Sequence, residues 1–107
     1  MVVVSSNLVY SHLKEPKVEK MFRLLENDVE VQSCLRMANV MAVERLMFND
    51  HGPVHSRIAS GSALEIFDLL TKKVTPTTVK NDVCYLEDAK VIVLCGAYLH
   101  DIGNIIH

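Results

Sequence analysis

A histidine and an aspartate stand side by side in the stretch YLHDIGN, residues 98–104. This doublet, His100 and Asp101, follows a long apolar run, where the hydrophobic pattern predicts core. Aspartate is seldom fully buried unless a partner compensates its charge. In one interpretation His100 is buried and hydrogen-bonded to a neighbour, and Asp101 caps the next turn. In the other interpretation both residues bind a divalent cation, because neutral imidazole and carboxylate groups are both ligands of metal ions.

A third potential ligand, His55, lies upstream in the stretch HGPVHSRIAS, residues 51–60. Proline is favoured at the first position of a helix, so Pro53 predicts that His55 lies near a helix start, where the helix dipole disfavours an extra proton on the ring and so favours neutral imidazole. Consecutive helical residues point about 100° apart, so His100 and Asp101 can share one ion only if another helix supplies a third ligand. His55 is the natural candidate. Two imidazoles and one carboxylate leave positions open for water and a phosphate oxygen.

This ligand set suits a divalent Mn, Fe, Mg, Zn, Co or Ni ion, and the sequence does not select among them. The same set occurs in iron oxygenases with two histidines and one carboxylate. Those sites are often built on β-barrels, and the sequence has no barrel pattern.

The hydrophobic spacing predicts an all-α domain of about four main helices. The predicted helices cover residues 15–27, 28–49 with Asp28 as N-cap, 53–72, and about 87–102 with Gly103 as C-terminal cap. In the third helix we expect a buried stripe made by Val54, Ile58, Ile66, Phe67 and Leu70. The fourth helix is apolar all round, which predicts a central, buried position. Residues 74–82 should form a loop with at most a single turn, and residues 1–14 a loose arm or a short strand.

Composition limits the possible functions. The chain has 107 residues, half of them hydrophobic, and a net charge of −2, so we expect one small globular domain, residues 1–107, that does not bind nucleic acid. Three widely spaced cysteines without a CxxC pair predict neither a disulfide framework nor a zinc knuckle and favour a reducing cytoplasm. Residues 1–13 and 91–100 are too short to cross a membrane, and the opening MVVV is too short for a signal peptide.

The stretches VHSRIAS and AYLHDIGN, with NDHG before the first of them, resemble the HD-domain superfamily of metal-dependent phosphohydrolases. In that family one histidine begins a helix, a His-Asp doublet closes another, and a final aspartate follows far downstream. The resemblance covers about residues 39–107. It implies a helical HD-like bundle that is incomplete relative to the family, because the downstream aspartate would lie beyond His107.

On this resemblance His55, His100 and Asp101 are the metal ligands, and His100 and Asp101 are the catalytic pair. The activity implied is hydrolysis of a nucleotide or another small phosphate ester. Three more residues are candidates for orienting a ligand or binding substrate: His51, Arg57 and His107. We expect His12 at the surface.

A second class of function stays open. Without later helices, the central helix would keep an exposed apolar side, and such surfaces usually find a partner. The chain would then be a catalytically impaired module for self-association or regulatory binding. A homo-oligomer is expected in either case.

Overall fold

The computed structural model describes residues 4–40, 52–82 and 84–102, and every regular element within these ranges is helical. The elements are η1 (Leu8–His12), α1 (Pro16–Asn27), α2 (Val29–Val40), α3 (Pro53–Thr71), α4 (Thr77–Lys80), α5 (Leu86–Leu99) and η3 (His100–Ile102), of which η1 and η3 are 3₁₀ helices. The all-α prediction is confirmed. The four main helices α1, α2, α3 and α5 fall in the predicted places, and α4 is the single turn of the predicted loop.

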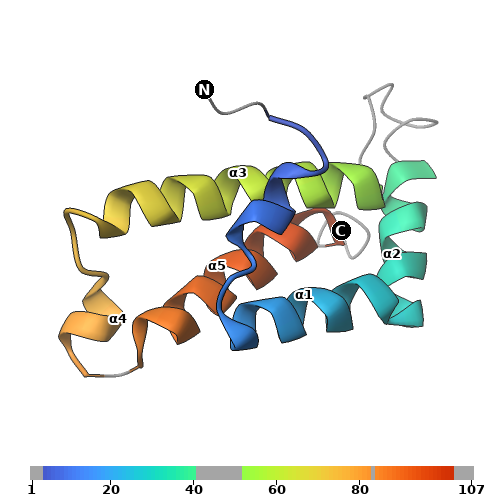
Figure 1. Cartoon of the computed structure of the whole chain (residues 1–107). Helices are drawn as coiled ribbons and strands as arrows, with labels where there is room; N and C mark the ends of the chain where they lie inside the picture. Colours follow the sequence, from blue (N-terminus) through green and yellow to red (C-terminus); the bar gives the residue numbers. More distant parts are fainter. Residues whose placement is uncertain (1–3, 41–51, 83, 103–107) are drawn as a thin grey trace.

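Helices α3 and α5 lie side by side and run in opposite directions, and theirs is the most extensive contact between two elements (Figure 1). Helix α1 packs along α5, and α2 stands at the end of the pair where α3 begins and α5 ends. This arrangement brings the start of α3 next to the end of α5. The two sequence segments that carry the candidate ligands therefore meet.

Capping groups fix where these helices start. The backbone N–H of Val31 donates to the carboxylate of Asp28 at 2.9 Å, which confirms Asp28 as the N-cap of α2. At the start of α5, the carboxylate of Asp88 accepts the backbone N–H of Tyr85 at 3.1 Å. Pro16 and Pro53 occupy the first turns of α1 and α3, where a missing N–H costs nothing. The C-terminal half of the predicted second helix, and Gly103, lie outside the described residues.

The core forms where α1, α3 and α5 meet η1 and α2. Its fully or nearly fully buried side chains are Val9, Val18, Phe22, Leu25, Leu35, Leu64, Leu94 and Tyr98. The ring of Phe22 makes edge-on contacts with the rings of Tyr10 and Tyr98, with centroids 5.5 and 6.1 Å apart. Such edge-to-face geometry is the favoured packing of aromatic rings.

The N-terminal segment differs from the expected arm or strand. Residues Leu8–His12 form the 3₁₀ helix η1, which packs on α3 with Val9 fully buried. Gly61 makes this contact possible: a Cβ atom at position 61 would lie 2.7 Å from the backbone nitrogen of Val9. A glycine within a helix is destabilising by itself, but Gly61 lets the backbone of η1 approach α3 closely.

The predicted buried stripe of α3 is wrong in part. Val54, Ile66 and Leu70 are 45%, 56% and 58% exposed. The buried residues of α3 are instead Ser56, Ser60, Gly61 and Leu64. Three of these are small, so η1 and α5 can approach the α3 backbone closely, and this close packing outweighs the hydrophobicity of the larger side chains.

Helix α5 is central, but it is not covered on all sides as expected. Ala89, Leu94 and Tyr98 are buried, whereas Ile92 is 62% exposed and Gly96 is exposed. None of the helices among the described residues combines the length and the apolar character that crossing a membrane requires.

Candidate metal centre

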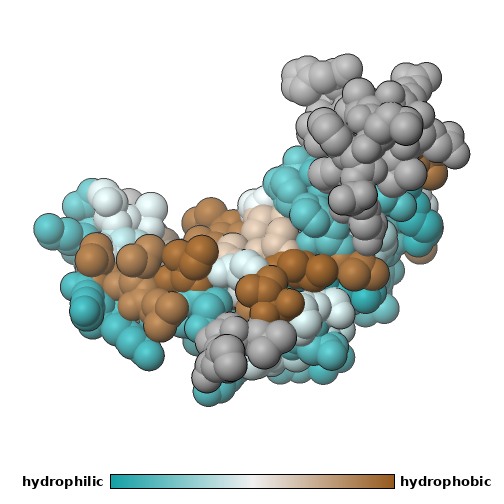
Figure 2. Space-filling view, turned by 90° about the horizontal axis from the view of Figure 1, so that it is seen from above, coloured by the Kyte–Doolittle hydropathy of each residue, from teal (hydrophilic) through white to brown (hydrophobic). Residues whose placement is uncertain are grey.

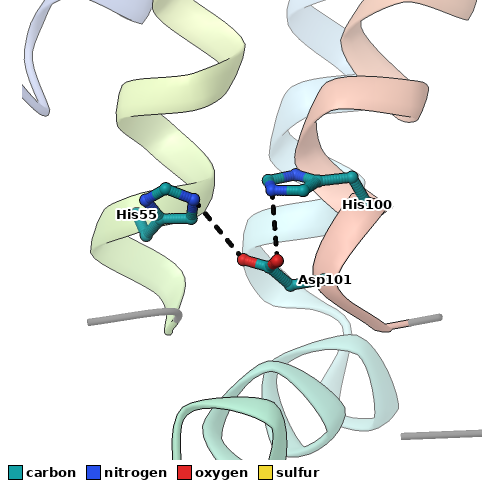
Figure 3. A group of neighbouring side chains, drawn as sticks. All are labelled: His55, His100 and Asp101. Atoms are coloured by element: carbon teal, nitrogen blue, oxygen red, sulfur yellow. Dashed lines mark ion pairs between the residues drawn. The ribbon is translucent and has the colours of Figure 1, made fainter. Parts of the chain in front are cut away.

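His55 lies in the first turn of α3. Gly52 precedes the helix in an extended conformation, and its carbonyl accepts the backbone N–H of Ser56 at 3.1 Å to close that turn. Helix packing against α5 then aims the imidazole of His55 at the end of α5 (Figure 3). The side chain remains about a third exposed, so a ligand could reach it from solvent.

His100 and Asp101 lie where α5 tightens into η3. A 3₁₀ helix has three residues per turn, so neighbouring side chains point about 120° apart. Asp101 turns inward, toward α3 and α2, and its side chain is 4% exposed. His100 stays at the surface with 43% of its side chain exposed. The doublet thus offers one buried anion and one accessible imidazole.

The three side chains meet around the Asp101 carboxylate, which lies between the two rings (Figure 3). Its Oδ1 is 3.1 Å from Nε2 of His100, and its Oδ2 is 3.5 Å from Nε2 of His55. The two imidazole rings are 5.3 Å apart between centroids. Two helices from distant parts of the sequence therefore place three potential ligands in one cluster.

The hydrogen bond of His100 indicates its tautomer. Its Nδ1 lies 2.6 Å from the carbonyl oxygen of Ala97, and because a carbonyl only accepts, Nδ1 must carry the proton. In a neutral ring Nε2 then presents its lone pair to the Asp101 carboxylate, and two acceptors that face each other repel. A second proton or a cation at this point removes the repulsion, and a carbonyl behind the ring is the usual support of a metal-binding histidine.

The spacing fits one ion with small adjustments. One ligand atom from each residue can be chosen so that all three lie within 4.8 Å of one another. Nitrogen and carboxylate ligands lie about 2.0–2.2 Å from a zinc-like ion, so two ligands of the same ion are at most about 4.4 Å apart. Small side-chain rotations would bring all three atoms within this limit.

Of the remaining predicted site residues, the structure describes only Arg57, and it places Arg57 outside the cluster. Nε of Arg57 donates to Oε1 of Glu26 in α1 at 2.8 Å. Arg57 is two residues after His55 in α3, so its side chain points about 200° away from that of His55 around the helix axis. This ion pair joins α3 to α1 and does not bring Arg57 into the cluster. His51 and His107 lie outside the described residues.

Sequence reasoning missed a polar network that lies behind the site. The hydroxyl of Tyr98 donates to the Glu26 carboxylate and accepts from Nε2 of Gln32, the latter at 2.8 Å. Burial is the main cause that raises the pKa of the Tyr98 phenol, and the Glu26 contact adds to it. Tyr98 lies one turn before Asp101, so the network fixes the end of α5 against α1 and α2. The only signal in the sequence is a tyrosine within an apolar helix, whose hydroxyl needs a partner when buried.

The expected surface position of His12 is wrong. Its side chain is 11% exposed, with Nε2 2.6 Å from Oε2 of Glu65 and Nδ1 2.6 Å from Oδ2 of Asp68. The nearly buried ammonium of Lys90 contacts Asp68 at 3.1 Å and Glu15 at 2.9 Å. We call these five residues the His12 cluster. They connect η1, α3 and α5 because η1 packs on α3, which sequence spacing did not predict.

Comparison with known proteins identifies a similar protein but does not indicate a function. The chain is similar to an uncharacterized protein of Methanocaldococcus jannaschii, with 47% identity over 79 residues. That stretch is 73% of this chain, yet it spans only 30% of the relative's length. No model of a protein family matches the chain. A search of the solved structures also gave no match.

Proposed function

We propose that the chain provides the metal-binding part of a cytoplasmic phosphohydrolase of the HD type, which hydrolyses a nucleotide or another small phosphate ester. His55, His100 and Asp101 would hold one divalent ion. The observation that carries the proposal is the convergence of these three side chains from α3 and η3, with Nε2 of His100 turned toward a buried carboxylate.

Two further observations support a cation at this place. The Asp101 carboxylate is almost completely removed from water, so solvent would weaken its attraction to a bound cation only a little. Both imidazoles remain partly exposed, so a cation bound there would stay accessible to substrate. A purely structural ion pair would not need accessible rings.

Each of these groups has a separate role in the proposed reaction. A divalent ion supplies Lewis acidity, which makes a water molecule more acidic and polarises a phosphoryl oxygen. Asp101 and the two imidazoles would hold that charge in place, and the Ala97 carbonyl keeps the His100 ring in the tautomer that can bind a cation. The ion pair between Arg57 and Glu26 and the Tyr98 hydroxyl keep α3, α1 and α5 in register around the cluster.

The test is elemental analysis of the purified protein together with phosphatase assays on a nitrophenyl phosphate and on a panel of nucleotides. We expect one transition-metal ion per chain in the wild type. His55→Ala and Asp101→Ala should both lose the metal and the activity. Glu19→Ala is the matched control, because this surface carboxylate of α1 pairs only with Arg23 in its own helix among the described contacts.

Stoichiometric metal that survives both His55→Ala and Asp101→Ala would overturn the proposed site. Circular dichroism of each variant separates loss of metal from loss of fold. If the protein binds metal but shows no phosphatase activity, the proposed metal site stands and the proposed hydrolase activity is wrong.

A second candidate function is a catalytically impaired module that associates with itself. The large apolar side chains exposed on α3 and α5 favour it, since monomeric proteins seldom expose contiguous apolar patches. Figure 2 shows such side chains gathered over the C-terminal part of α3. A metal-free oligomer without phosphatase activity would support the module over the enzyme.

A further inference from the structure

The imidazole of His12 lies between two carboxylates of α3. Its Nδ1 is 2.6 Å from Oδ2 of Asp68, and its Nε2 is 2.6 Å from Oε2 of Glu65. The contact with Asp68 has the geometry of a hydrogen bond, and the contact with Glu65 is a close ion pair without that geometry. Glu65 and Asp68 are three residues apart, so they are neighbours on one side of the helix and their charges repel each other.

The two contacts together require a proton on each ring nitrogen. A carboxylate only accepts, and a neutral imidazole has a single N–H, so one ring nitrogen would turn a lone pair toward a carboxylate oxygen. Two such groups repel each other at 2.6 Å. A second proton makes both contacts attractive, and the ring takes it before a carboxylate does because imidazole is the stronger base.

The neighbouring charges do not replace this proton. The Lys90 ammonium of α5 contacts Asp68 and Glu15, and no described contact joins it to Glu65. With a charged ring, the His12 cluster has two cations for its three carboxylates. With a neutral ring, Lys90 alone remains to balance all three.

The ring can exchange its proton with water. The His12 cluster borders a hollow of about 390 Å³, which Lys14 and Lys72 also line. Neither lysine forms an ion pair with the cluster among the described contacts. The protonation state of His12 can therefore follow the pH of the solution.

The same ring attaches η1 to α3. His12 is the last residue of η1, and within the described residues it supplies the only ion pairs between the two elements. The rest of the contact is apolar and close, with Val9 buried against the backbone at Gly61. A change in the charge of His12 thus acts directly on the packing of η1.

We propose that His12 is a pH-sensitive switch: the protonated ring holds η1 on α3, and loss of the proton loosens η1. Histidine is the side chain that ordinarily changes its charge between about pH 5 and 8. Docking of η1 should therefore weaken as the pH rises through this range. Glu65 lies ten residues after His55, about 15 Å along α3, so the switch does not depend on the proposed metal or activity.

The test is amide hydrogen exchange of residues Leu8–His12, followed by NMR from pH 5 to pH 8 with a chelator present. Each rate is divided by the rate of an unfolded chain at the same pH, which removes the pH dependence of the exchange chemistry. The ring resonances of His12 report its protonation in the same samples. We expect the protection of these amides to fall on the order of tenfold as the ring loses its proton, because one charge-assisted contact is lost.

Glu65→Gln separates a switch from an ordinary structural contact. The new amide can donate to Nε2 of a neutral ring, so this variant should keep η1 docked at pH 8 and lose the pH dependence. A purely structural ion pair predicts weaker docking at every pH instead. Glu19→Gln is the matched control and should behave as the wild type, because Glu19 pairs with Arg23 in its own helix.

Three results would overturn the proposal. The first is constant protection of η1 while the His12 ring loses its proton. The second is a ring that keeps its charge from pH 5 to pH 8. The third is a Glu65→Gln protein, folded by circular dichroism, whose protection falls with pH as in the wild type. The wild-type measurement decides by itself if the variant does not fold.

Discussion

Gly61 of α3 and Val9 of η1 are in backbone contact, so close that a Cβ atom at position 61 would lie 2.7 Å from the Val9 nitrogen. That distance is too short for any carbon–nitrogen contact without movement of one backbone. Val9 is completely buried by the same contact. The N-terminal 3₁₀ helix thus packs on the middle of α3, the longest helix among the described residues, at a position where only glycine fits.

Alanine at the two helical glycines should have opposite effects. Gly61→Ala should destabilise the protein by about 1–3 kcal/mol, because the added methyl group forces η1 away from α3. Gly96→Ala should stabilise the monomer by up to about 1 kcal/mol, because its methyl group meets nothing and alanine favours the helix. Urea unfolding at low protein concentration measures both. Equal effects of the two substitutions would contradict the packing of η1 on α3.

Divalent cations should stabilise the fold through the candidate metal centre. An ion that binds only the folded state adds about 2.7 kcal/mol at a hundred times its dissociation constant. The thermal midpoint of the wild type should therefore rise with added Mn²⁺ and fall again with a chelator. Asp101→Asn keeps the shape of the side chain but removes its charge, and its midpoint should not respond. An equal rise in both proteins would place the ion elsewhere.

The Tyr98 hydroxyl should contribute to stability. Tyr98→Phe leaves the Glu26 carboxylate and the Gln32 amide without this partner, which should cost about 1–3 kcal/mol in the free energy of unfolding. Tyr10→Phe is the matched control, because the Tyr10 side chain is half exposed and makes only a ring contact among the described interactions. Chemical unfolding of both variants gives the comparison. If the Tyr98→Phe protein is as stable as the control, the hydrogen bonds of Tyr98 do not contribute to the stability of the fold.

Alkaline pH should destabilise the protein through the same tyrosine. Burial raises the pKa of Tyr98 above the ordinary value of 10.0, so the folded state keeps the phenolic proton that the unfolded state releases. The unfolded state then binds fewer protons, and the free energy of unfolding falls as the pH rises above 10. Tyr98→Phe should show a shallower fall between neutral pH and pH 11 in urea titrations. Parallel curves for the wild type and the variant would disprove this linkage.

The sequence predicted the helices and the candidate cluster better than it predicted the packing. Pro53, Asp28 and the doublet at 100–101 are local signals, and local signals set where helices start and which residues end them. The buried side of α3 was predicted wrongly because hydrophobicity favours Ile66 and Leu70, whereas the close neighbours η1 and α5 select Ser60 and Gly61. Which side of a helix becomes buried depends on the elements that pack against it. The spacing of residues within one helix does not show which elements these will be.

The network around Tyr98 was missed for a related reason. Glu26, Gln32 and Tyr98 come from three helices, and each is an ordinary residue in its own segment. Their relationship exists only after α1, α2 and α5 have packed. His55 was predicted as a partner of the doublet only because a family resemblance and a ligand requirement both pointed to it.

Polar side chains connect α3 to α5, and to the η3 turn that follows α5, at two separate places. The contact between Asp68 and Lys90 lies at one, and the contact between His55 and Asp101 at the other. His55 and Asp68 are thirteen residues apart on one helix, about 20 Å along its axis. Because these two contacts lie far apart, together they resist a change in the angle at which α3 crosses α5, and they hold His55 beside Asp101.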